Sequence, residues 1–159
     1  MAFPLINKQT LSTTAAPAAV WRAFTRVDLW PQVLPSVITA RLEPAEAFAG
    51  GSRILTRATP GSGAADLEYR IVAAEAPRRL VLEIEDTDYR ATTEYVIADA
   101  PDAAGMTDVA VTSRLEAHGL SQIWRFLVWR ERLTPILSAS ARQRGQAFLD
   151  LAERIGETG

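Results

Sequence analysis

Residues 15–37 read AAPAAVWRAFTRVDLWPQVLPSV, and the first half of this stretch predicts a short helix. Pro17 suits the first position of a helix, because the N–H that proline lacks would have no partner there. Val20, Trp21 and Phe24 follow at positions that place apolar side chains on one helical face. This face predicts packing of the helix against the rest of the molecule.

The second half of the stretch carries two prolines that limit the next helix to a short segment. Asp28 is a candidate N-cap, and Pro31 then lies within the first turn. Pro35 directs the chain toward an extended segment, because the residue before a proline is disfavoured in the helical region. Trp30 and Leu34 are spaced i, i+4 and share one face. We expect this face to close one end of a core or a cavity.

Outside this stretch the hydrophobic pattern changes to the alternation of strands. Leu67, Tyr69 and Ile71 alternate with polar residues, which is typical of a strand with one buried face. Because short turns and no helix separate successive extended segments, the pattern favours an antiparallel meander over parallel strands with crossover helices. The predicted strands lie within residues 4–14, 37–48, 52–59, 65–76, 80–86, 91–99 and 107–118.

The C-terminal part of the chain predicts a long helix. Thr134 and Pro135 have the types of an N-cap and a first helical residue, so we expect the helix to begin there. Apolar residues then recur at helical spacing up to Ile155. The middle of the helix carries small residues, at Ser138, Ala139, Ser140, Ala141 and Gly145. A helix with large residues at both ends and small ones between them leaves room for a cavity beside it.

Composition limits the classes of function. The chain has 159 residues, enough for one domain over residues 1–159 with a sizeable core. It has no cysteine and a single histidine, which excludes disulfides, thiolate chemistry and multi-histidine metal sites. The net charge of −2 offers no positive field for nucleic acid. No apolar run approaches the roughly 20 residues that span a bilayer, and the N-terminus lacks a signal-peptide pattern, so we expect a cytoplasmic protein.

The order of these elements and several local sequences carry a family resemblance. Besides residues 15–37, the local sequences are AGGSRIL (49–55), VAAEAPRRLVLEI (72–84) and TTEYVIADAPDAAGMTDVAVTSRLE (92–116). The chain resembles the polyketide cyclase/dehydrase and lipid-transport superfamily, the START-like (SRPBCC) helix-grip proteins. The resemblance implies an α+β fold in which a curved antiparallel sheet of about six to seven strands grips a long C-terminal helix. Members include ligand carriers, cyclases, dehydratases, quinone-binding proteins and chaperone-associated modules, so the resemblance implies no single function.

Under this fold, strand alternation predicts an internal cavity with a mostly apolar wall. Charged residues such as Glu68, Glu83 and Arg114 fall on the opposite face of the sheet, so no carboxylate pair for acid–base chemistry is predicted inside. A few inward hydroxyls among apolar side chains suit a hydrophobic ligand oriented by a few hydrogen bonds. The predicted ligand-binding residues are Trp30, Leu34, Leu67, Tyr69, Leu82, Ile84, Thr93, Tyr95, Ser113, Leu137, Ala141 and Arg144.

Several polar residues allow two interpretations. Tyr69 and Tyr95 either donate hydrogen bonds to a ligand carbonyl or act as core aromatics. Arg144 either binds a ligand carboxylate through its planar fork or extends along the surface into solvent. His118, in EAHGL, either serves as a general base or lies in a solvated turn. The sequence alone favours the structural role in each case.

The sequence leaves three functions open. They are a binding protein or carrier for a lipid, quinone or polyketide-like aromatic molecule, a cyclase or dehydratase that uses the same cavity, and a protein-interaction module. An ion-poor pocket favours the first, so we predict a hydrophobic small molecule as partner, with no catalytic residue, metal, cofactor or nucleic acid. A homodimer is compatible with the sequence. So is a transient membrane contact through QIWRFLVWRER (122–132), where basic and bulky apolar residues occur together.

Overall fold

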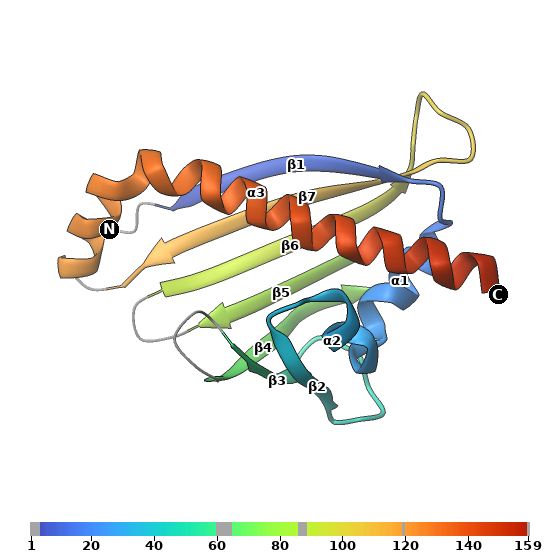
Figure 1. Ribbon diagram of the computed structural model, residues 1–159, viewed down its shortest axis with the longest axis horizontal. Coiled ribbons are helices and arrows are strands. Elements are labelled where there is room, and N and C mark those ends of the chain that lie inside the picture. Colours follow the sequence, from blue (N-terminus) through green and yellow to red (C-terminus); the bar gives the residue numbers. More distant parts are fainter. Residues whose placement is uncertain (1–3, 60–64, 86–88, 119, 159) are drawn as a thin grey trace.

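A curved antiparallel sheet with one long helix lying across it forms the body of the protein (Figure 1). The computed structural model describes residues 4–59, 65–85, 89–118 and 120–158, without the side chains of 120–133, 136, 137 and 158. Within these residues the sheet has seven strands in the order β1-β7-β6-β5-β4-β3-β2. The elements are β1 (Leu5–Thr13), α1 (Pro17–Thr25), the 3-10 turn η1 (Val27–Leu29), α2 (Trp30–Val33), β2 (Val37–Glu43), β3 (Arg53–Ala58), β4 (Ala65–Glu75), β5 (Arg79–Glu85), β6 (Tyr89–Asp99), β7 (Thr107–Ala117) and α3 (Leu120–Thr158).

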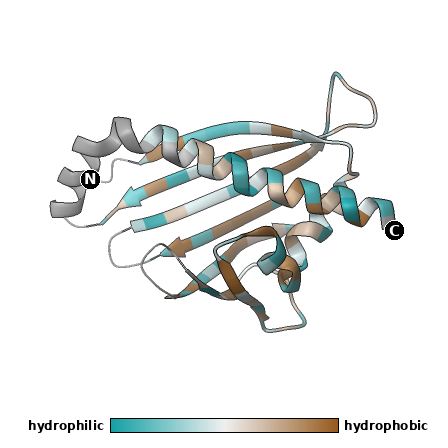
Figure 2. Cartoon of the chain, viewed as in Figure 1, coloured by the Kyte–Doolittle hydropathy of each residue, from teal (hydrophilic) through white to brown (hydrophobic). Residues whose placement is uncertain are grey.

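Strand β4 shows the alternation that the sequence predicts, whereas in β5 the consecutive residues Leu80, Val81 and Leu82 are all buried. Along β4, Leu67 and Tyr69 are half-buried and Ile71 is buried, whereas the residues between them are exposed. Figure 2 shows the same alternation as brown and teal segments along the strands. On the outer face Glu83 of β5 forms an ion pair with Arg70 of β4. The alternation therefore sorts apolar and charged side chains to opposite faces of the sheet, as expected.

The two short helices follow β1 as predicted, but their boundary differs from the prediction. Pro17 occupies the start of α1. The prediction of Asp28 as an N-cap is wrong, because Asp28 lies inside η1 and α2 begins only at Trp30. The carboxylate of Asp28 instead accepts hydrogen bonds from the Arg26 guanidinium at 2.9 and 2.8 Å. The Asp28 carboxylate thus accepts two charge-assisted hydrogen bonds from one guanidinium, in place of the single bond that an N-cap side chain accepts from a backbone N–H.

The long C-terminal helix begins earlier than the sequence predicts. We expected its first residue at Thr134–Pro135, but α3 runs from Leu120 to Thr158 with Pro135 in its interior. An interior proline removes one backbone hydrogen bond and costs about 3 kcal/mol. The preceding residues 120–134 include three leucines and three arginines, which are strong helix formers, and these residues favour a helix that continues across the proline.

One close contact brings α3 down onto the first strand. A Cβ atom at Gly145 would lie 2.5 Å from Leu11 Cδ1 of β1. Real Cβ atoms do not approach other heavy atoms so closely, so the missing side chain allows helix and strand to meet here. α3 crosses the sheet from this contact, and its C-terminal end lies beside α1 (Figure 1).

An aromatic cluster fills the part of the core enclosed by the sheet, α1, α2 and α3. The ring of Phe24 lies 4.5 Å from the ring of Tyr95 and 4.8 Å from the ring of Phe148, measured between centroids. Trp30 meets Phe148 edge-on at 5.7 Å. These tilted and edge-on arrangements are the favoured geometries of aromatic pairs. The cluster closes one end of the space between the sheet and α3.

Candidate ligand cavity

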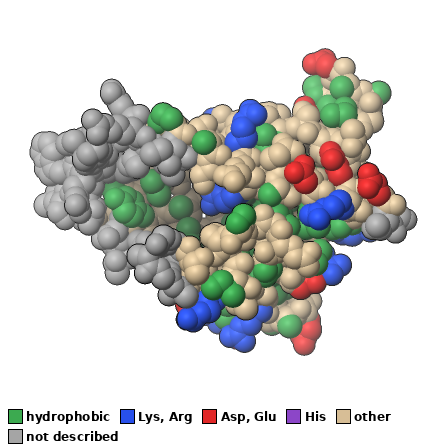
Figure 3. All heavy atoms as spheres, in the orientation of Figure 1, with side chains coloured by type: hydrophobic (Ala, Val, Ile, Leu, Met, Phe, Trp, Pro, Cys, Tyr) green, Lys and Arg blue, Asp and Glu red, His purple; other side chains and the backbone are tan. Residues whose placement is uncertain are grey.

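The remaining space between the sheet and α3 is a cavity of about 310 Å³. This volume lies at the lower end of the range for small-molecule sites. Figure 3 shows a hollow in the surface on this side of the molecule. The described residues that line the cavity are Leu5, Asn7, Trp30, Leu34, Leu67, Tyr69, Leu82, Ile84, Ala91, Thr92, Thr93, Tyr95, Ser113, Arg114, Leu115, Thr134, Arg144 and Phe148.

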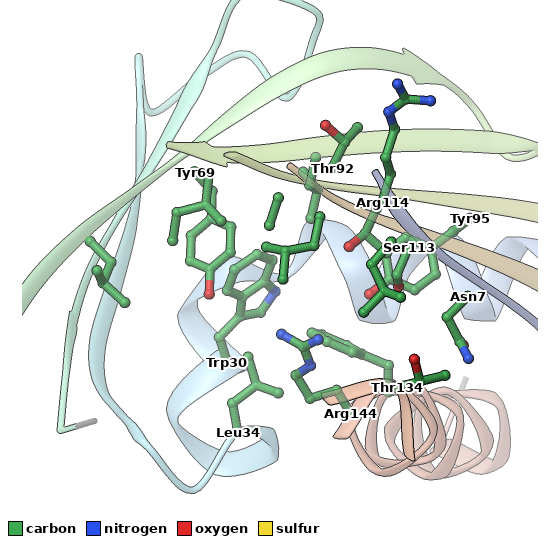
Figure 4. A pocket seen from close by; sticks show the side chains of 18 residues that line it. Asn7, Trp30, Leu34, Tyr69, Thr92, Tyr95, Ser113, Arg114, Thr134 and Arg144 are labelled. Atoms are coloured by element: carbon green, nitrogen blue, oxygen red, sulfur yellow. The ribbon is translucent and has the colours of Figure 1, made fainter. Parts of the chain in front are cut away.

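Trp30 forms the best-anchored part of the apolar wall. Its indole N–H donates a hydrogen bond of 3.1 Å to the backbone carbonyl of Phe24, and the residue is 2% exposed. Its ring meets Tyr69 edge-on at 5.7 Å. Figure 4 shows Trp30 and Leu34 rising from the α2 region toward the sheet. The two prolines that shorten this helix thus place an aromatic side chain both in the core and at the cavity wall.

A row of polar side chains crosses the sheet side of the cavity. Ser113 of β7 lies opposite Asn7 of β1 and opposite Thr93 of β6 in the strand register. The Asn7 side-chain oxygen accepts a hydrogen bond of 3.2 Å from Gln9. Ser113 Oγ is buried and has no hydrogen-bond partner among the described residues. A buried hydroxyl without a partner is costly, so Ser113 has a donor available for a ligand oxygen.

Two arginines line the cavity, and they differ in their partners. The Arg114 guanidinium pairs with Glu116 at 2.7 Å, and Figure 4 shows its side chain directed away from Arg144 and Trp30, on the same side as Thr92. Arg144 extends from α3 toward Trp30 in the same view. It has no ion pair or hydrogen bond with any residue that the structure describes. Among the described residues, Arg144 is therefore the cation that a ligand would meet on the helix side of the cavity.

Tyr69 and Tyr95 are neutral hydroxyl groups in an apolar setting. Burial raises the pKa of Tyr69, and the positive charge of Arg144 opposes this shift. Burial likewise raises the pKa of Tyr95, again opposed by Arg144, while Tyr69 adds a smaller upward effect. Both groups stay protonated at neutral pH and can donate a hydrogen bond.

These raised pKa values predict a loss of stability in alkali. Both tyrosines are neutral below the ordinary pKa of 10.0, where their contribution to stability is fully present. Above that pH the unfolded chain ionises first, so the free energy of unfolding should fall as pH rises. Urea unfolding at a series of alkaline pH values measures this fall. It should be shallower in the Tyr69→Phe/Tyr95→Phe variant, and an unchanged slope would show that these hydroxyls are not the cause.

His118 lies apart from this wall. It follows β7 directly, and its Nε2 lies 3.6 Å from Glu85 Oε1. The same carboxylate oxygen accepts a hydrogen bond of 3.1 Å from Arg90. His118 is not among the described residues that line the cavity. Its Nε2 is buried without a hydrogen-bond partner among the described residues, and the imidazole lies at the end of the sheet, outside the cavity wall.

The structure places most of the predicted site residues together. Trp30, Leu34, Leu67, Tyr69, Leu82, Ile84, Thr93, Tyr95, Ser113 and Arg144 all line the cavity. Ala141 is buried but is not part of the wall, since the turn of α3 that faces the cavity presents Arg144 and Phe148. The side chain of Leu137 lies outside the described residues, as do those of Trp124 and Trp129.

Sequence reasoning missed part of the wall. The missed residues are Leu5, Asn7, Ala91, Thr92, Arg114, Leu115, Thr134 and Phe148. Leu5 and Asn7 alternate within β1, so the same period-2 pattern indicates them once β1 is paired with β7. Phe148 follows Arg144 by four residues on α3, which is the spacing of one helical face.

Metal-ligand groups and membrane-spanning helices are both absent from the described part of the chain. Among the residues whose side chains the structure describes, no group of three or more His, Cys, Asp or Glu residues is arranged to hold a metal ion. In the described part of the chain, no helix is both long enough and apolar enough to cross a membrane.

Comparison with known proteins gives no match in sequence and many in structure. No protein-family model and no curated protein matches the chain. The di-domain ARO/CYC BexL from the BE-7585A biosynthetic pathway aligns at a TM-score of 0.73 with 17% identity, over 94% of this chain and 50% of BexL. This chain thus spans about half of that protein.

Two structures of similar length also align along nearly the whole chain. The Zhui aromatase/cyclase from Streptomyces sp. R1128 gives a TM-score of 0.71 with 13% identity, covering 96% of this chain and 95% of its own. A START superfamily protein from Mycobacterium smegmatis gives 0.67 with 9% identity, covering 94% and 98%. At these identities the matches show the fold alone. The START-like helix-grip fold expected from the sequence is confirmed.

Proposed function

We propose that this chain binds a small, mostly apolar molecule in the cavity between the sheet and α3. The observation that carries the proposal is the cavity itself, with its volume of about 310 Å³ and its wall of aromatic and aliphatic side chains. Small-molecule sites share this character, with a few polar groups that orient the ligand. Here those groups are Asn7, Tyr69, Thr93, Ser113 and Arg144.

A cyclase or dehydratase that uses the same cavity is the second candidate. The aromatase/cyclases with similar folds make it worth testing. Such a reaction needs a group that moves protons within reach of the substrate. Among the described wall residues there is no aspartate, glutamate or histidine, and His118 lies outside the wall, directly after β7. The wall therefore favours binding over acid–base catalysis.

The partner we propose is a hydrophobic small molecule such as a lipid, a quinone or a polyketide-like aromatic. A role as a protein-interaction module has less support. The large exposed apolar side chains among the described residues form a small set, Ile6, Ile38, Val72 and Val96.

Four expectations from the sequence stay predictions. They are the cytoplasmic location, the single domain over residues 1–159, the homodimer and the transient membrane contact.

Fluorescence titration with N-phenylnaphthylamine tests the proposal. This probe is neutral and aromatic, and its emission rises in apolar surroundings. We expect one saturable site with micromolar affinity, because buried apolar area drives binding but the probe is small. An Ile38→Ser variant should bind equally well, since Ile38 is 49% exposed and lies away from the cavity wall. A signal that does not saturate, or that Ile38→Ser abolishes, would overturn the proposal.

A further inference from the structure

The charge balance of the cavity wall points to one kind of ligand. Of the described residues that line the wall, only Arg114 and Arg144 are charged, and none is acidic. The charge of Arg114 is matched by Glu116 at 2.7 Å. The charge of Arg144 has no acidic partner among the described residues. The described part of the wall thus carries one cation in excess.

The positive charge of Arg144 is felt inside the cavity. Its positive charge influences two tyrosines of the opposite wall, Tyr69 and Tyr95, which belong to β4 and β6. The effect is smaller than that of burial, and it shows that the guanidinium lies on the side of the cavity that faces these two hydroxyls. The residue itself is exposed, so water hydrates its guanidinium. A ligand that displaces this water must replace its hydrogen bonds, and an anionic oxygen does so best.

The sheet side of the cavity offers a hydrogen-bond donor that can serve the same ligand oxygen as Arg144. Ser113 Oγ is buried, lines the cavity and has no partner among the described residues. Figure 4 shows Ser113 and Arg144 on opposite sides of the same space, with Trp30 beside them. One guanidinium and one hydroxyl suit a carboxylate, which has one negative charge and two oxygens. A phosphate group carries more charge and more oxygens than these donors serve.

We propose that the cavity prefers an apolar carboxylic acid, with its carboxylate at Arg144 and its hydrocarbon or aromatic body against Trp30 and Leu82. This inference rests on the proposed function, because it names the ligand class of the same site. The Arg144 guanidinium donates two hydrogen bonds to the carboxylate oxygens, and Ser113 Oγ donates to one of them. The wall on either side supplies apolar contact.

A matched pair of probes tests this preference. Naphthoate and naphthamide have nearly the same shape and differ in charge. Isothermal titration at neutral pH should show naphthoate binding to the wild type at least tenfold more tightly than naphthamide. In Arg144→Met the two probes should bind about equally, with the affinity for naphthamide kept, because methionine retains the apolar stem. Arg144→Lys should keep part of the preference.

Arg142→Met supplies the matched control. Arg142 is an exposed residue on the same helix that does not line the cavity, and its substitution changes the net charge equally. It should leave the preference for naphthoate unchanged. Equal affinities in the wild type, or a preference that survives Arg144→Met, would overturn the inference. If neither naphthyl probe nor N-phenylnaphthylamine binds, the proposed function fails instead, so the two failures are distinguishable.

Discussion

A Ser113→Leu variant should bind N-phenylnaphthylamine at least about tenfold more weakly than the wild type and yet be more stable by about 1 kcal/mol. The hydroxyl that it removes is buried without a partner among the described residues. An unpaired buried hydroxyl costs about 1–3 kcal/mol, and leucine replaces it with apolar contacts. The same added atoms occupy space that the probe needs, which lowers affinity.

In the Ser113→Leu variant the free energy of unfolding should rise while the affinity for the probe falls. Urea unfolding measures the free energy, and probe fluorescence measures the affinity. Ser113→Ala is the control, since it removes the hydroxyl without filling space and should bind the neutral probe normally. If Ser113→Leu is instead destabilised by overpacking, or binds the probe as the wild type does, the space beside Ser113 is not a ligand site.

Trp30→Ala should reduce the free energy of unfolding by about 3–5 kcal/mol, the range for removal of a large buried aromatic. The residue is 2% exposed, and its ring packs edge-on against Tyr69 and Phe148. Its indole N–H also holds the backbone carbonyl of Phe24 at 3.1 Å. The substitution therefore opens a void and leaves that carbonyl without this donor.

Two comparison variants separate these contributions. Trp30→Phe keeps an aromatic ring but removes the hydrogen bond, so its loss should be much smaller. Trp21→Ala removes a half-buried indole that meets only Phe48 among the described aromatic rings, at 6.1 Å, and should also cost less than Trp30→Ala. Urea unfolding of all three variants gives the ranking. A loss below about 1 kcal/mol in Trp30→Ala would contradict the role of Trp30 as the anchor of the aromatic cluster.

The fold was predictable because its signals are local and agree with one another. Alternation along β4 to β7 identifies strands without any knowledge of their partners, and Pro17 marks the start of α1. The start of α3 was not predictable in this way. Thr134–Pro135 has the residue types of a helix start, and only the position of the segment in the folded chain shows that the helix continues through Pro135.

The cavity wall was predictable to the extent that it follows from alternation. Tyr95 and Ser113 fall on the inward face by counting along one strand. Asn7 requires the register of β1 against β7, which the sequence does not specify by itself. The isolation of Arg144 from carboxylates, and the missing partner of Ser113, depend on the positions of many distant residues. Such features appear only in three dimensions.

The location of a bound neutral probe tests directly whether the cavity between the sheet and α3 is a ligand site. We would measure intermolecular nuclear Overhauser effects between N-phenylnaphthylamine and the protein. Binding between the sheet and α3 predicts contacts to the Trp30 indole and to the methyl groups of Leu82 and Ile84, which line the cavity. Contacts confined to exposed residues of the outer surface, such as Ile38 and Val72, would contradict it.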